Sequence, residues 1–439
     1  MSHETHHVGA GPALSRDLAL ATWGLFVGLA LLLLAGGLFS TLLGVRAETE
    51  GLATGITGII SASYYLGFVV GSRLTLAALG KVGHIRAYAA LAALLTVAML
   101  GVGITDHWLP WALLRLVTGL CFAGQYVVAE SWLNDLATNE NRGKLLAVYS
   151  VVVSGAFAAG QAVVFAFDAV VVTGFAVAAI AASLAVIPVT LSEEAAPPKS
   201  ALSEKVSFMY LANVVPTGLG ACFLVGIAHG AMGGLPAVYA TRVGLPAGWV
   251  GLFAAAPSVG GVVLQWPISA ASDDVDRRVV GLAAAVAAVG TAAVLILTPE
   301  THWMVLVWFA LLGGLSYPLY SIAAAYTNDW VAPEHMNAAA SQLVTLYGAG
   351  AVLGPFATAG MMIAMGPVGF FWALLILHGM IAVFLVVRIR AWRAPLAKRP
   401  WDEVSIPARA FYVPATIVAV GRRRRHRRVD RDPDQPQGD

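Results

Sequence analysis

Charged residues are scarce in this sequence. Asp, Glu, Lys and Arg make up 11% of its 439 residues, about half of the usual share in soluble globular proteins. Hydrophobic residues make up 59%. Charge is rarer still in the body of the chain, because half of the 26 Lys and Arg residues lie from Arg388 onward. This composition excludes a soluble enzyme and predicts an integral membrane protein.

Cysteine is nearly absent as well. Cys121 and Cys222 both lie inside apolar runs, which excludes a disulfide framework and a zinc or iron–sulfur site. The sequence contains no GxxxxGK[ST] phosphate-binding loop and no nucleophile elbow, so it should not hydrolyse ATP by itself. We therefore expect no enzymatic activity, no cofactor and no metal site.

Long hydrophobic runs fill most of the chain. Twelve of them are long enough to cross a membrane as a helix, which takes about 20 residues. Their continuous apolar character favours helices over β-barrel strands, in which polar and apolar residues alternate. The last two share the run 335–387 and are divided by the turn signal Met365-Gly366-Pro367-Val368-Gly369. Charged or polar residues bracket the other ten at 17–46, 50–73, 86–106, 107–129, 144–168, 168–193, 205–242, 242–273, 278–300 and 300–329.

The basic residues indicate the orientation in the membrane. If both termini are cytoplasmic, 23 of the 26 Lys and Arg residues lie on the cytoplasmic side. Only Arg46 and Arg242 then lie outside, and Arg115 lies within the membrane. This distribution agrees with the positive-inside rule. We expect a multi-pass protein of the plasma (inner) membrane of a bacterium, with both termini in the cytoplasm.

The two halves of the sequence resemble each other. Each half has a basic loop after its second run (81–86 and 276–278) and an Asn-Asp pair closing its fourth (Asn134-Asp135 and Asn328-Asp329). Such repeats are typical of helical transporters, whose substrate site lies between the repeats near the middle of the membrane. We predict an all-α integral membrane fold with twelve transmembrane helices in two pseudo-symmetric six-helix bundles. Its expected parts are a cytoplasmic N-terminus (1–16), an N-terminal bundle (17–191), a central cytoplasmic loop (192–207), a C-terminal bundle (208–392) and a basic cytoplasmic tail (393–439).

Several motifs in these runs carry a family resemblance. In the first half they are Ser63-Tyr64-Tyr65-x-Gly67-x-x-x-Gly71, Gly80-Lys81-x-Gly83-x-x-Arg86, Arg115-x-x-x-Gly119, Ala129-Glu130-Ser131-Trp132-Leu133-Asn134 and Asn141-Arg142-Gly143. In the second half they are Gln265-Trp266-Pro267-Ile268, Ser272-Asp273, Asp276-Arg277-Arg278, Tyr317-Pro318-Leu319-Tyr320, Asn328-Asp329 and Gly354-Pro355. On these motifs, residues 15–390 resemble the major facilitator superfamily and, within it, the YcaD-like branch. The resemblance implies a secondary transporter that works by alternating access and is driven by the proton gradient. It implies no particular substrate.

One position departs from the superfamily's loop motif. The residue four positions after Gly71 is acidic in the family but is Thr75 in this chain, whereas the second half keeps the acid as Asp273. The resemblance therefore implies a cytoplasmic salt-bridge latch that is complete only in the second half. The candidate residues of this cytoplasmic gate are Lys81, Arg86, Asp273, Arg277 and Arg278.

Arg115 interrupts the fourth hydrophobic run. A charge at membrane depth costs at least about 2.5 to 3.5 kcal/mol, so Arg115 needs a compensating role. On a helix, Arg115 shares one face with Tyr126 and Glu130. We predict that this face lines a central cavity, in which Arg115 binds an anionic group of the substrate or helps to bind a coupling ion. The alternative is a structural arginine bonded to backbone carbonyls of a neighbouring helix.

Further polar residues at membrane depth are candidates for substrate or coupling sites. Glu130 lies about 22 Å along the helix from Arg115, towards the cytoplasm. It either binds a proton or pairs with Arg86 or Lys81 in the gate. His229 either couples transport to protons or is a neutral, hydrogen-bonded core residue. The uncharged candidates are Gln125, Gln161, Gln265 and Gln342.

The tail has a separate expected role. Its basic cluster at 422–428 (RRRRHRR) predicts binding to anionic lipid, at about 1 kcal/mol per charge near the surface. We expect no nucleic-acid binding, because the interleaved aromatic residues of single-strand binders are missing. The predicted function is proton-coupled secondary active transport of a small-molecule substrate by a monomer. Two alternatives stay open: an exporter of amphiphilic or toxic compounds, and a sensor on a transporter fold that binds a partner and moves no solute.

Overall fold

The computed structural model describes residues 16–137, 142–167, 172–192, 207–299, 303–332 and 335–391. Within these ranges, twelve helices are long and apolar enough to cross a membrane, which confirms the predicted number of spans. The expected basic tail (393–439), the first fifteen residues and most of the central loop lie outside the described residues.

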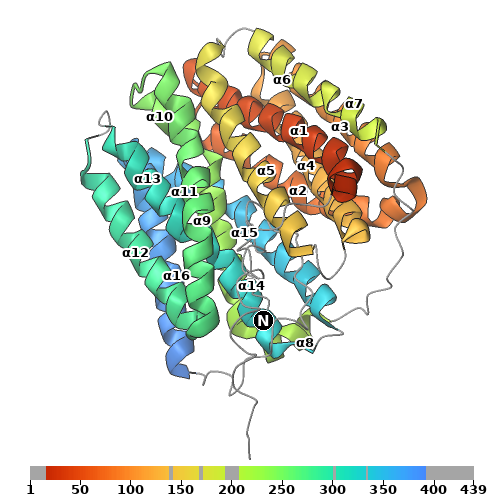
Figure 1. Cartoon of the computed structure of the whole chain (residues 1–439). Helices are drawn as coiled ribbons and strands as arrows, with labels where there is room; N and C mark the ends of the chain where they lie inside the picture. Colours follow the sequence, from red (N-terminus) through yellow and green to blue (C-terminus); the bar gives the residue numbers. More distant parts are fainter. Residues whose placement is uncertain are drawn as a thin grey trace, which may run out of the picture.

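The first six spans form the N-terminal bundle, drawn in red to yellow in Figure 1. Their helices are α1 (Arg16–Thr49), α2 (Thr54–Val82), α3 (His84–Ile104), α4 (Trp108–Leu136), α5 (Arg142–Ala162) with the 3-10 turn η1 (Val163–Ala166), and α6 (Val172–Leu184) with α7 (Val186–Thr190). Gly83, which has a φ of 83°, separates α2 from α3. Only a residue without a side chain adopts this conformation at little cost.

The last six spans form the C-terminal bundle, drawn in green to blue. Their helices are α8 (Phe208–Val214), α9 (Pro216–Gly234) and α10 (Pro236–Arg242) in one span, then α11 (Ala247–Asp274), α12 (Arg277–Leu297), α13 (Met304–Ser316) with α14 (Pro318–Trp330), α15 (Met336–Met365) and α16 (Gly369–Ala391). Proline opens α9, α10 and α14, because its ring fits the first helical turn but interrupts the turn before it. Gly366, with a φ of 73°, ends α15 at the expected turn.

Close glycine contacts repeat in the two bundles. A side chain at Gly67 in α2 would clash with the backbone of Leu116 in α4, and one at Gly260 in α11 would clash with the backbone of Ala310 in α13. The two glycines are 193 positions apart. Their partners, Leu116 and Ala310, are 194 positions apart, and the two Asn-Asp pairs are also 194 positions apart. Small residues let helix backbones approach closely in lipid. This shared packing supports the pseudo-symmetry of the two bundles.

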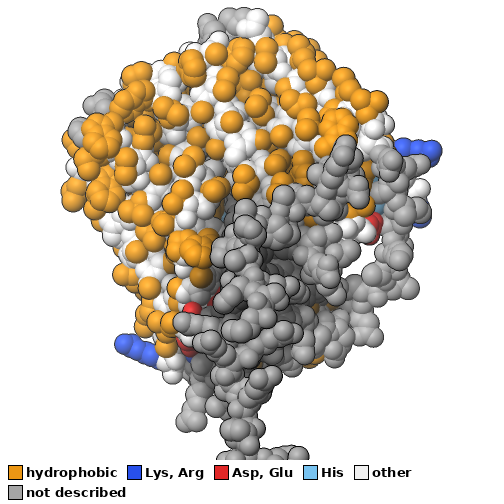
Figure 2. Space-filling view, in the orientation of Figure 1, with side chains coloured by type: hydrophobic (Ala, Val, Ile, Leu, Met, Phe, Trp, Pro, Cys, Tyr) orange, Lys and Arg blue, Asp and Glu red, His pale blue; other side chains and the backbone are white. Residues whose placement is uncertain are grey.

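Because the number of spans is even, α1 begins and α16 ends on the same side of the molecule, which we call the terminal face. The opposite side, where α1 ends and α2 begins, is the distal face. The bundles meet where α2 packs on α15, α5 on α11 and α1 on α10. Hydrophobic side chains cover much of the visible outer surface between the two faces (Figure 2). Such an extended apolar surface suits contact with lipid.

Candidate functional site

A cavity lies between the two bundles, in the distal half of the molecule. Its walls come from α1, α2, α4, α5, α9, α10 and α11. Most of its lining is small or apolar, and the polar side chains in it are Ser40, Thr41, Thr57, Ser61, Arg115 and Gln161. Among the described residues of this lining, Arg115 is the charged one. The cavity therefore has a positive electrostatic character.

Arg115 is held at the wall of this cavity by a hydroxyl and two aromatic rings. Its Nη2 donates a hydrogen bond of 2.8 Å to Oγ of Ser40 in α1. Its guanidinium carbon lies 4.5 Å from the ring centre of Tyr64 and 5.4 Å from that of Phe39. An arginine over the face of an aromatic ring is attracted by the ring's negative quadrupole. The structure thus places Arg115 at the cavity as expected, and its role in binding stays a prediction.

The other polar residues of α4 lie in different surroundings. Tyr126 packs against Phe68, with 5.9 Å between the ring centres. Glu130 is buried and accepts a hydrogen bond of 3.1 Å from the hydroxyl of Tyr149 in α5. Lys81 and Arg86, the other partners considered for Glu130, have exposed side chains. Gln125 is buried and donates to the backbone oxygen of Tyr88 in α3, so it joins helices inside the bundle.

The remaining glutamines are spread over three places. Gln161 lies at the cavity wall with Arg115. Gln265 is buried inside the C-terminal bundle, where its Nε2 donates to Oγ of Ser321 at 2.8 Å. Gln342 is half-buried in α15. Of the four candidate glutamines, the structure therefore brings only Gln161 to the described lining of the cavity.

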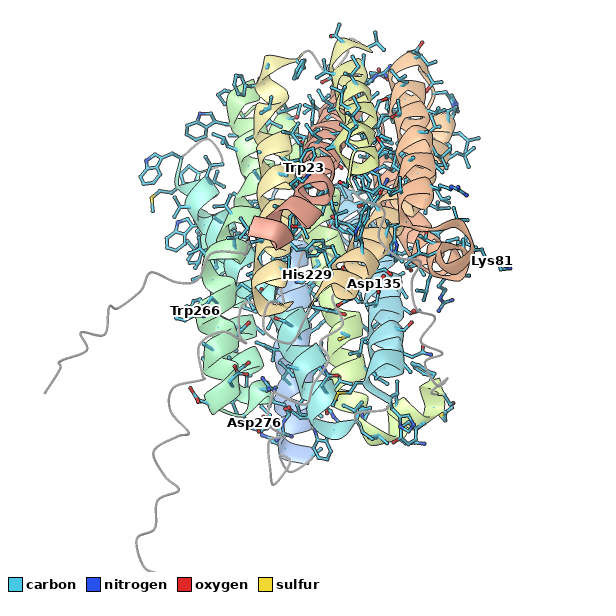
Figure 3. All side chains as sticks on the ribbon, turned by 45° about the vertical axis from the view of Figure 1, so that its right-hand side comes forward. Trp23, Lys81, Asp135, His229, Trp266 and Asp276 are labelled. Atoms are coloured by element: carbon cyan, nitrogen blue, oxygen red, sulfur yellow. The ribbon has the colours of Figure 1, made fainter. Side chains whose placement is uncertain are left out.

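His229 lies in the interior of the C-terminal bundle, in the distal half of α9 (Figure 3). Its Nε2 is 3.0 Å from the backbone oxygen of Ser316, and its Nδ1 is 2.9 Å from the hydroxyl of Tyr347 in α15. A second buried histidine, His378 in α16, lies 2.8 Å from Oγ of the same Ser316. The sequence analysis did not single out His378, because a lone histidine in an apolar run has no motif to mark it.

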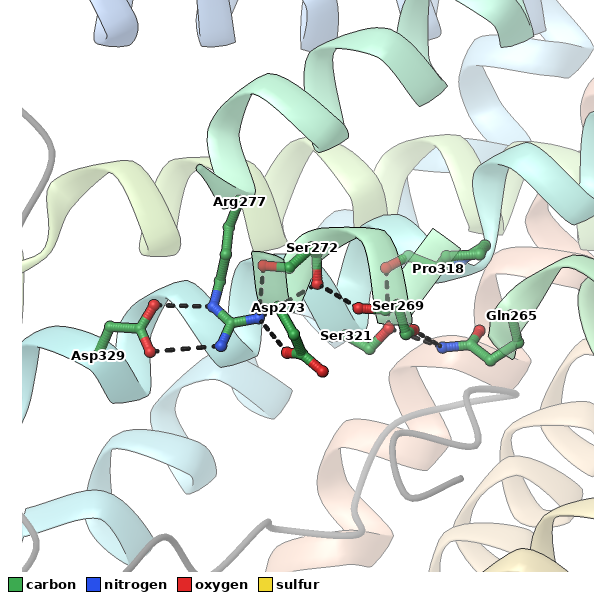
Figure 4. A network of polar contacts seen from close by, with 8 residues as sticks. All are labelled: Gln265, Ser269, Ser272, Asp273, Arg277, Pro318, Ser321 and Asp329. Atoms are coloured by element: carbon green, nitrogen blue, oxygen red, sulfur yellow. Dashed lines mark hydrogen bonds and ion pairs between the residues drawn. The ribbon is translucent and has the colours of Figure 1, made fainter. Parts of the chain in front are cut away.

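Two candidate gate residues of the C-terminal bundle, Asp273 and Arg277, meet at the terminal face (Figure 4). Arg277, which is 2% exposed, lies 3.0 Å from Asp273 in α11 and 2.7 Å from Asp329 in α14, so its ion pairs join helices of one bundle. Arg278 lies 2.8 Å from Asp276, the residue that caps its own helix α12. Figure 3 shows Lys81 at the end of α2, pointing away from the protein. The pairing of Asp273 with Arg277 agrees with the expected latch, and its function as a gate stays a prediction.

An ion pair at the distal face connects the two bundles. Arg242 at the end of α10 lies 2.7 Å from Oε1 and 2.5 Å from Oε2 of Glu48 in α1. Its Nη1 also donates to Oγ1 of Thr54 in α2 at 2.9 Å. Sequence reasoning missed this contact, since the two charged residues are 194 positions apart and share no motif. It joins α10 of the C-terminal bundle to α1 and α2 of the N-terminal bundle.

Metal binding finds no support in the described residues, among which no three His, Cys, Asp or Glu side chains form a cluster that could hold an ion. The geometry instead provides a cavity between two bundles, an arginine at its wall and an ion pair that joins the bundles at the distal face. Helical transporters built from two repeats bind their substrate between the repeats and move one repeat against the other around that site.

Comparison with known proteins supports the predicted family. The model of the Major Facilitator Superfamily matches residues 217–428, and that of Sugar (and other) transporters matches residues 26–196. The chain is thus similar to the major facilitator superfamily over its C-terminal half. It is 29% identical over 343 residues to the protein named uncharacterized MFS-type transporter YcaD of Escherichia fergusonii, and this match covers 77% of this chain and 88% of the relative. The YcaD of Salmonella arizonae is 28% identical over 344 residues, with the same coverage.

Solved transporters share the fold. The crystal structure of the nucleoside transporter NupG matches with a TM-score of 0.68 and 14% identity, covering 84% of this chain and 98% of NupG. A bacterial homologue of the human lysosomal transporter Spinster, in an inward-facing and unoccupied conformation, matches with a TM-score of 0.66 and 15% identity. The match covers 85% of this chain and 96% of the homologue. These likenesses show a shared fold, while the sequence matches and the twelve apolar helices support a multi-pass membrane transporter.

Proposed function

We propose that this transporter is a secondary active transporter of the bacterial plasma membrane, which moves a small anionic solute by alternating access and couples it to protons. The observation that carries the proposal is Arg115 at the wall of a cavity between the bundles, with no carboxylate in the described lining. The terminal face is the cytoplasmic side in this proposal, as the basic residues indicate.

The cavity favours an anion for an energetic reason. Arg115 keeps its charge at membrane depth, where an unbalanced charge is costly. A bound carboxylate or phosphate is attracted by the positive charge of Arg115 and accepts charge-assisted hydrogen bonds from its planar guanidinium. Gln161 and the hydroxyls of Ser40 and Thr57 provide further polar contacts in the same lining.

Alternating access gives the ion pairs different functions. Arg242 and Glu48 hold the distal face closed. Release of the solute to the distal side requires this pair to break. We propose that Lys81, Arg86, Asp273, Arg277 and Arg278 form the gate on the terminal face in the opposite conformation.

Binding tests the proposal directly. Purified protein is screened by thermal shift against organic mono- and dicarboxylates and phosphate esters, each paired with a neutral analogue, and every hit is followed by flux into proteoliposomes. We expect anions to raise the Tm and neutral analogues to have little effect. Arg115→Gln should abolish the shift and Arg115→Lys should retain part of it. The control is Arg390→Gln, which removes an exposed arginine at the end of α16.

The outcomes separate the alternatives. Wild-type affinity in a well-folded Arg115→Gln protein would refute the role of Arg115 in binding. Loss of folded protein in both Arg115 variants would favour a structural arginine. A ligand that binds without any flux would favour the sensor, and outward flux of amphiphilic cations or neutral drugs would favour the exporter. A reporter fused after Arg390 that is active only in the periplasm would reverse the orientation.

A further inference from the structure

Gln161 brings an unused hydrogen-bond acceptor to the cavity. Its side chain is 7% exposed and lies in α5, at the wall of the cavity that Arg115 also lines. Its Oε1 is buried, and no hydrogen bond from the described residues reaches this atom. Leaving a buried acceptor without a donor costs free energy. A ligand that donates a hydrogen bond to Oε1 removes this cost.

Arg115 and Gln161 approach the same turn of α1. Arg115 donates to Oγ of Ser40 in this helix. A side chain at Gly37, three positions before Ser40, would meet the backbone nitrogen of Gln161. Three positions correspond to about 4.5 Å along a helix. Because both residues also line the cavity, one small ligand can contact the guanidinium and the amide together.

Three hydroxyl groups of the lining present lone pairs rather than hydrogens to a ligand. Thr41 and Thr57 donate their hydroxyl hydrogens to backbone oxygens four positions earlier in the chain, at 3.0 and 3.4 Å. Ser61 donates to the backbone oxygen of Gly234 in the other bundle, at 2.8 Å. A hydroxyl group has one hydrogen, so these oxygens can only accept a further hydrogen bond.

The break between α9 and α10 adds an acceptor from the C-terminal bundle. Gly234 ends α9 and Pro236 opens α10, and both line the cavity. Proline has no N–H, so the carbonyl of Met232 lacks the helical donor four positions later. The cavity thus combines the cationic donor Arg115 with neutral acceptors from both bundles.

We infer that the solute is a hydroxylated carboxylate, in which Arg115 binds the carboxylate and Oε1 of Gln161 accepts from a hydroxyl group; this inference rests on the proposed function. A carboxylate alone offers only acceptors, so it matches Arg115 but leaves Gln161 without a donor. The single negative charge of a carboxylate equals the positive charge of Arg115, whereas a phosphate monoester carries more.

A hydroxyl group suits this cavity better than an ammonium group. Both groups donate hydrogen bonds, but an ammonium group brings a positive charge that Arg115 repels. A hydroxyl group supplies the donor without a charge. The geometry therefore favours a hydroxy acid over an amino acid of the same size.

Three-carbon acids test the inference, because they share one chain length and differ in single groups. Binding of propionate, lactate, glycerate, alanine and pyruvate to the purified protein is measured by thermal-shift titration. Lactate and glycerate should bind at least about threefold to tenfold more tightly than propionate, the range that one net hydrogen bond provides. Alanine has an ammonium group in place of the hydroxyl, and pyruvate has a carbonyl that only accepts. Neither should bind more tightly than propionate.

Gln161→Met removes the acceptor and keeps a side chain of similar length. The ratio of the dissociation constants of propionate and lactate should then fall towards one, while the affinity for propionate changes little. Gln265→Met is the matched control, since Gln265 is a buried glutamine inside the C-terminal bundle and lies outside the described lining of the cavity. It should keep the wild-type ratio. Any larger acid that the screen finds is compared with its deoxy analogue in the same way.

The inference is overturned if propionate binds as tightly as lactate, or if alanine or pyruvate is preferred. Pyruvate in particular would bind best if the amide presented its N–H to the ligand. The inference is also overturned if Gln161→Met keeps the wild-type preference or Gln265→Met loses it equally. If Gln161→Met fails to fold, the wild-type series decides alone.

The same data separate this inference from the proposed function. If all the carboxylates bind equally and their binding depends on Arg115, the selection of a hydroxyl group is wrong while anion transport stands. If no anion of the screen binds, the proposed function itself fails.

Discussion

The two bundles carry corresponding polar clusters at the terminal face, but with different cations. In the N-terminal bundle, His84 begins α3, and its Nε2 lies 3.7 Å from Asp135 and 3.0 Å from Oγ of Ser131. In the C-terminal bundle, Arg277 begins α12 and contacts both Asp329 and Asp273. Asp135 and Asp329 are the aspartates of the repeated Asn-Asp pair.

The two clusters differ in whether their basic residue is always charged. A guanidinium stays protonated at any pH in a cell and offers several donors in a fixed plane, so the C-terminal cluster is always charged. An imidazole forms an ion pair only when it is protonated. Asp135 is also 32% exposed, whereas Asp273 and Asp329 are 7% and 9% exposed. We infer that the C-terminal cluster fixes the helix ends of its bundle more strongly than its counterpart does.

Removing Arg277 should have the largest effect. Arg277→Gln leaves two buried carboxylates without their shared cation, which is expected to lower the free energy of unfolding by about 3 to 5 kcal/mol. The measurement is thermal or denaturant unfolding of the purified protein in detergent. The control Arg390→Gln removes an exposed arginine and should change the value by less than about 0.5 kcal/mol. A loss below about 1 kcal/mol for Arg277→Gln would contradict the structural importance of this cluster.

The spans and one ion pair could be predicted from the sequence because they depend on residues that are close together in the chain. The twelve spans follow from uninterrupted apolar runs, and Asp273 and Arg277 stand four positions apart. The contacts that the sequence did not predict are formed between distant segments. Arg242 and Glu48 meet only after the two bundles assemble. Glu130 has its hydrogen bond with Tyr149 of the next span, a neutral side chain that no rule of charge pairing selects.

The candidate site also contains residues whose position the sequence predicted and residues for which it did not. Arg115 was identified because a charge inside an apolar run is rare and costly. Glutamine is less informative, because an amide can satisfy its hydrogen bonds in many places. Gln125 and Gln265 therefore proved to join helices within their own bundles, through Tyr88 and Ser321.

The equivalent aspartates provide a matched test. Asp329→Asn removes a charged acceptor at 2.7 Å from Arg277 and should cost about 1.5 to 3 kcal/mol of the free energy of unfolding. Asp135→Asn weakens a longer and more exposed contact and should cost less than about 1 kcal/mol. Both variants are compared in the same unfolding assay. If both variants lose the same free energy of unfolding, the two polar clusters stabilise their helix ends equally.

The ion pair across the bundles should affect populations rather than the stability of a bundle. Arg242→Gln is expected to favour the distal-open conformation by about 1 kcal/mol, or about fivefold in the ratio of the two conformations. Distances between spin labels placed at Ile104 and Leu297, the exposed distal ends of α3 and α12, report this ratio. Arg46→Gln is the control, because Arg46 pairs with Glu50 and Asp106 inside the N-terminal bundle. If both variants change the ratio equally, Arg242 has no special role in closing the distal face.

The smallest expected effect concerns pH. The coupling energy between His84 and Asp135 is measured by a double-mutant cycle with His84→Gln and Asp135→Asn, and that between Arg277 and Asp329 by the corresponding cycle. Since His84 pairs electrostatically only as an imidazolium, its coupling should be larger at about pH 5.5 than at about pH 8, by less than about 1 kcal/mol. The coupling of Arg277 with Asp329 should be the same at both values, because the guanidinium does not titrate in this range. His84→Gln keeps a side chain that can form a hydrogen bond with Ser131, so the loss of a hydrogen bond does not mimic the loss of charge. A His84 coupling that stays constant with pH would mean that the two bundles differ only in strength and not in the chemistry of their terminal clusters.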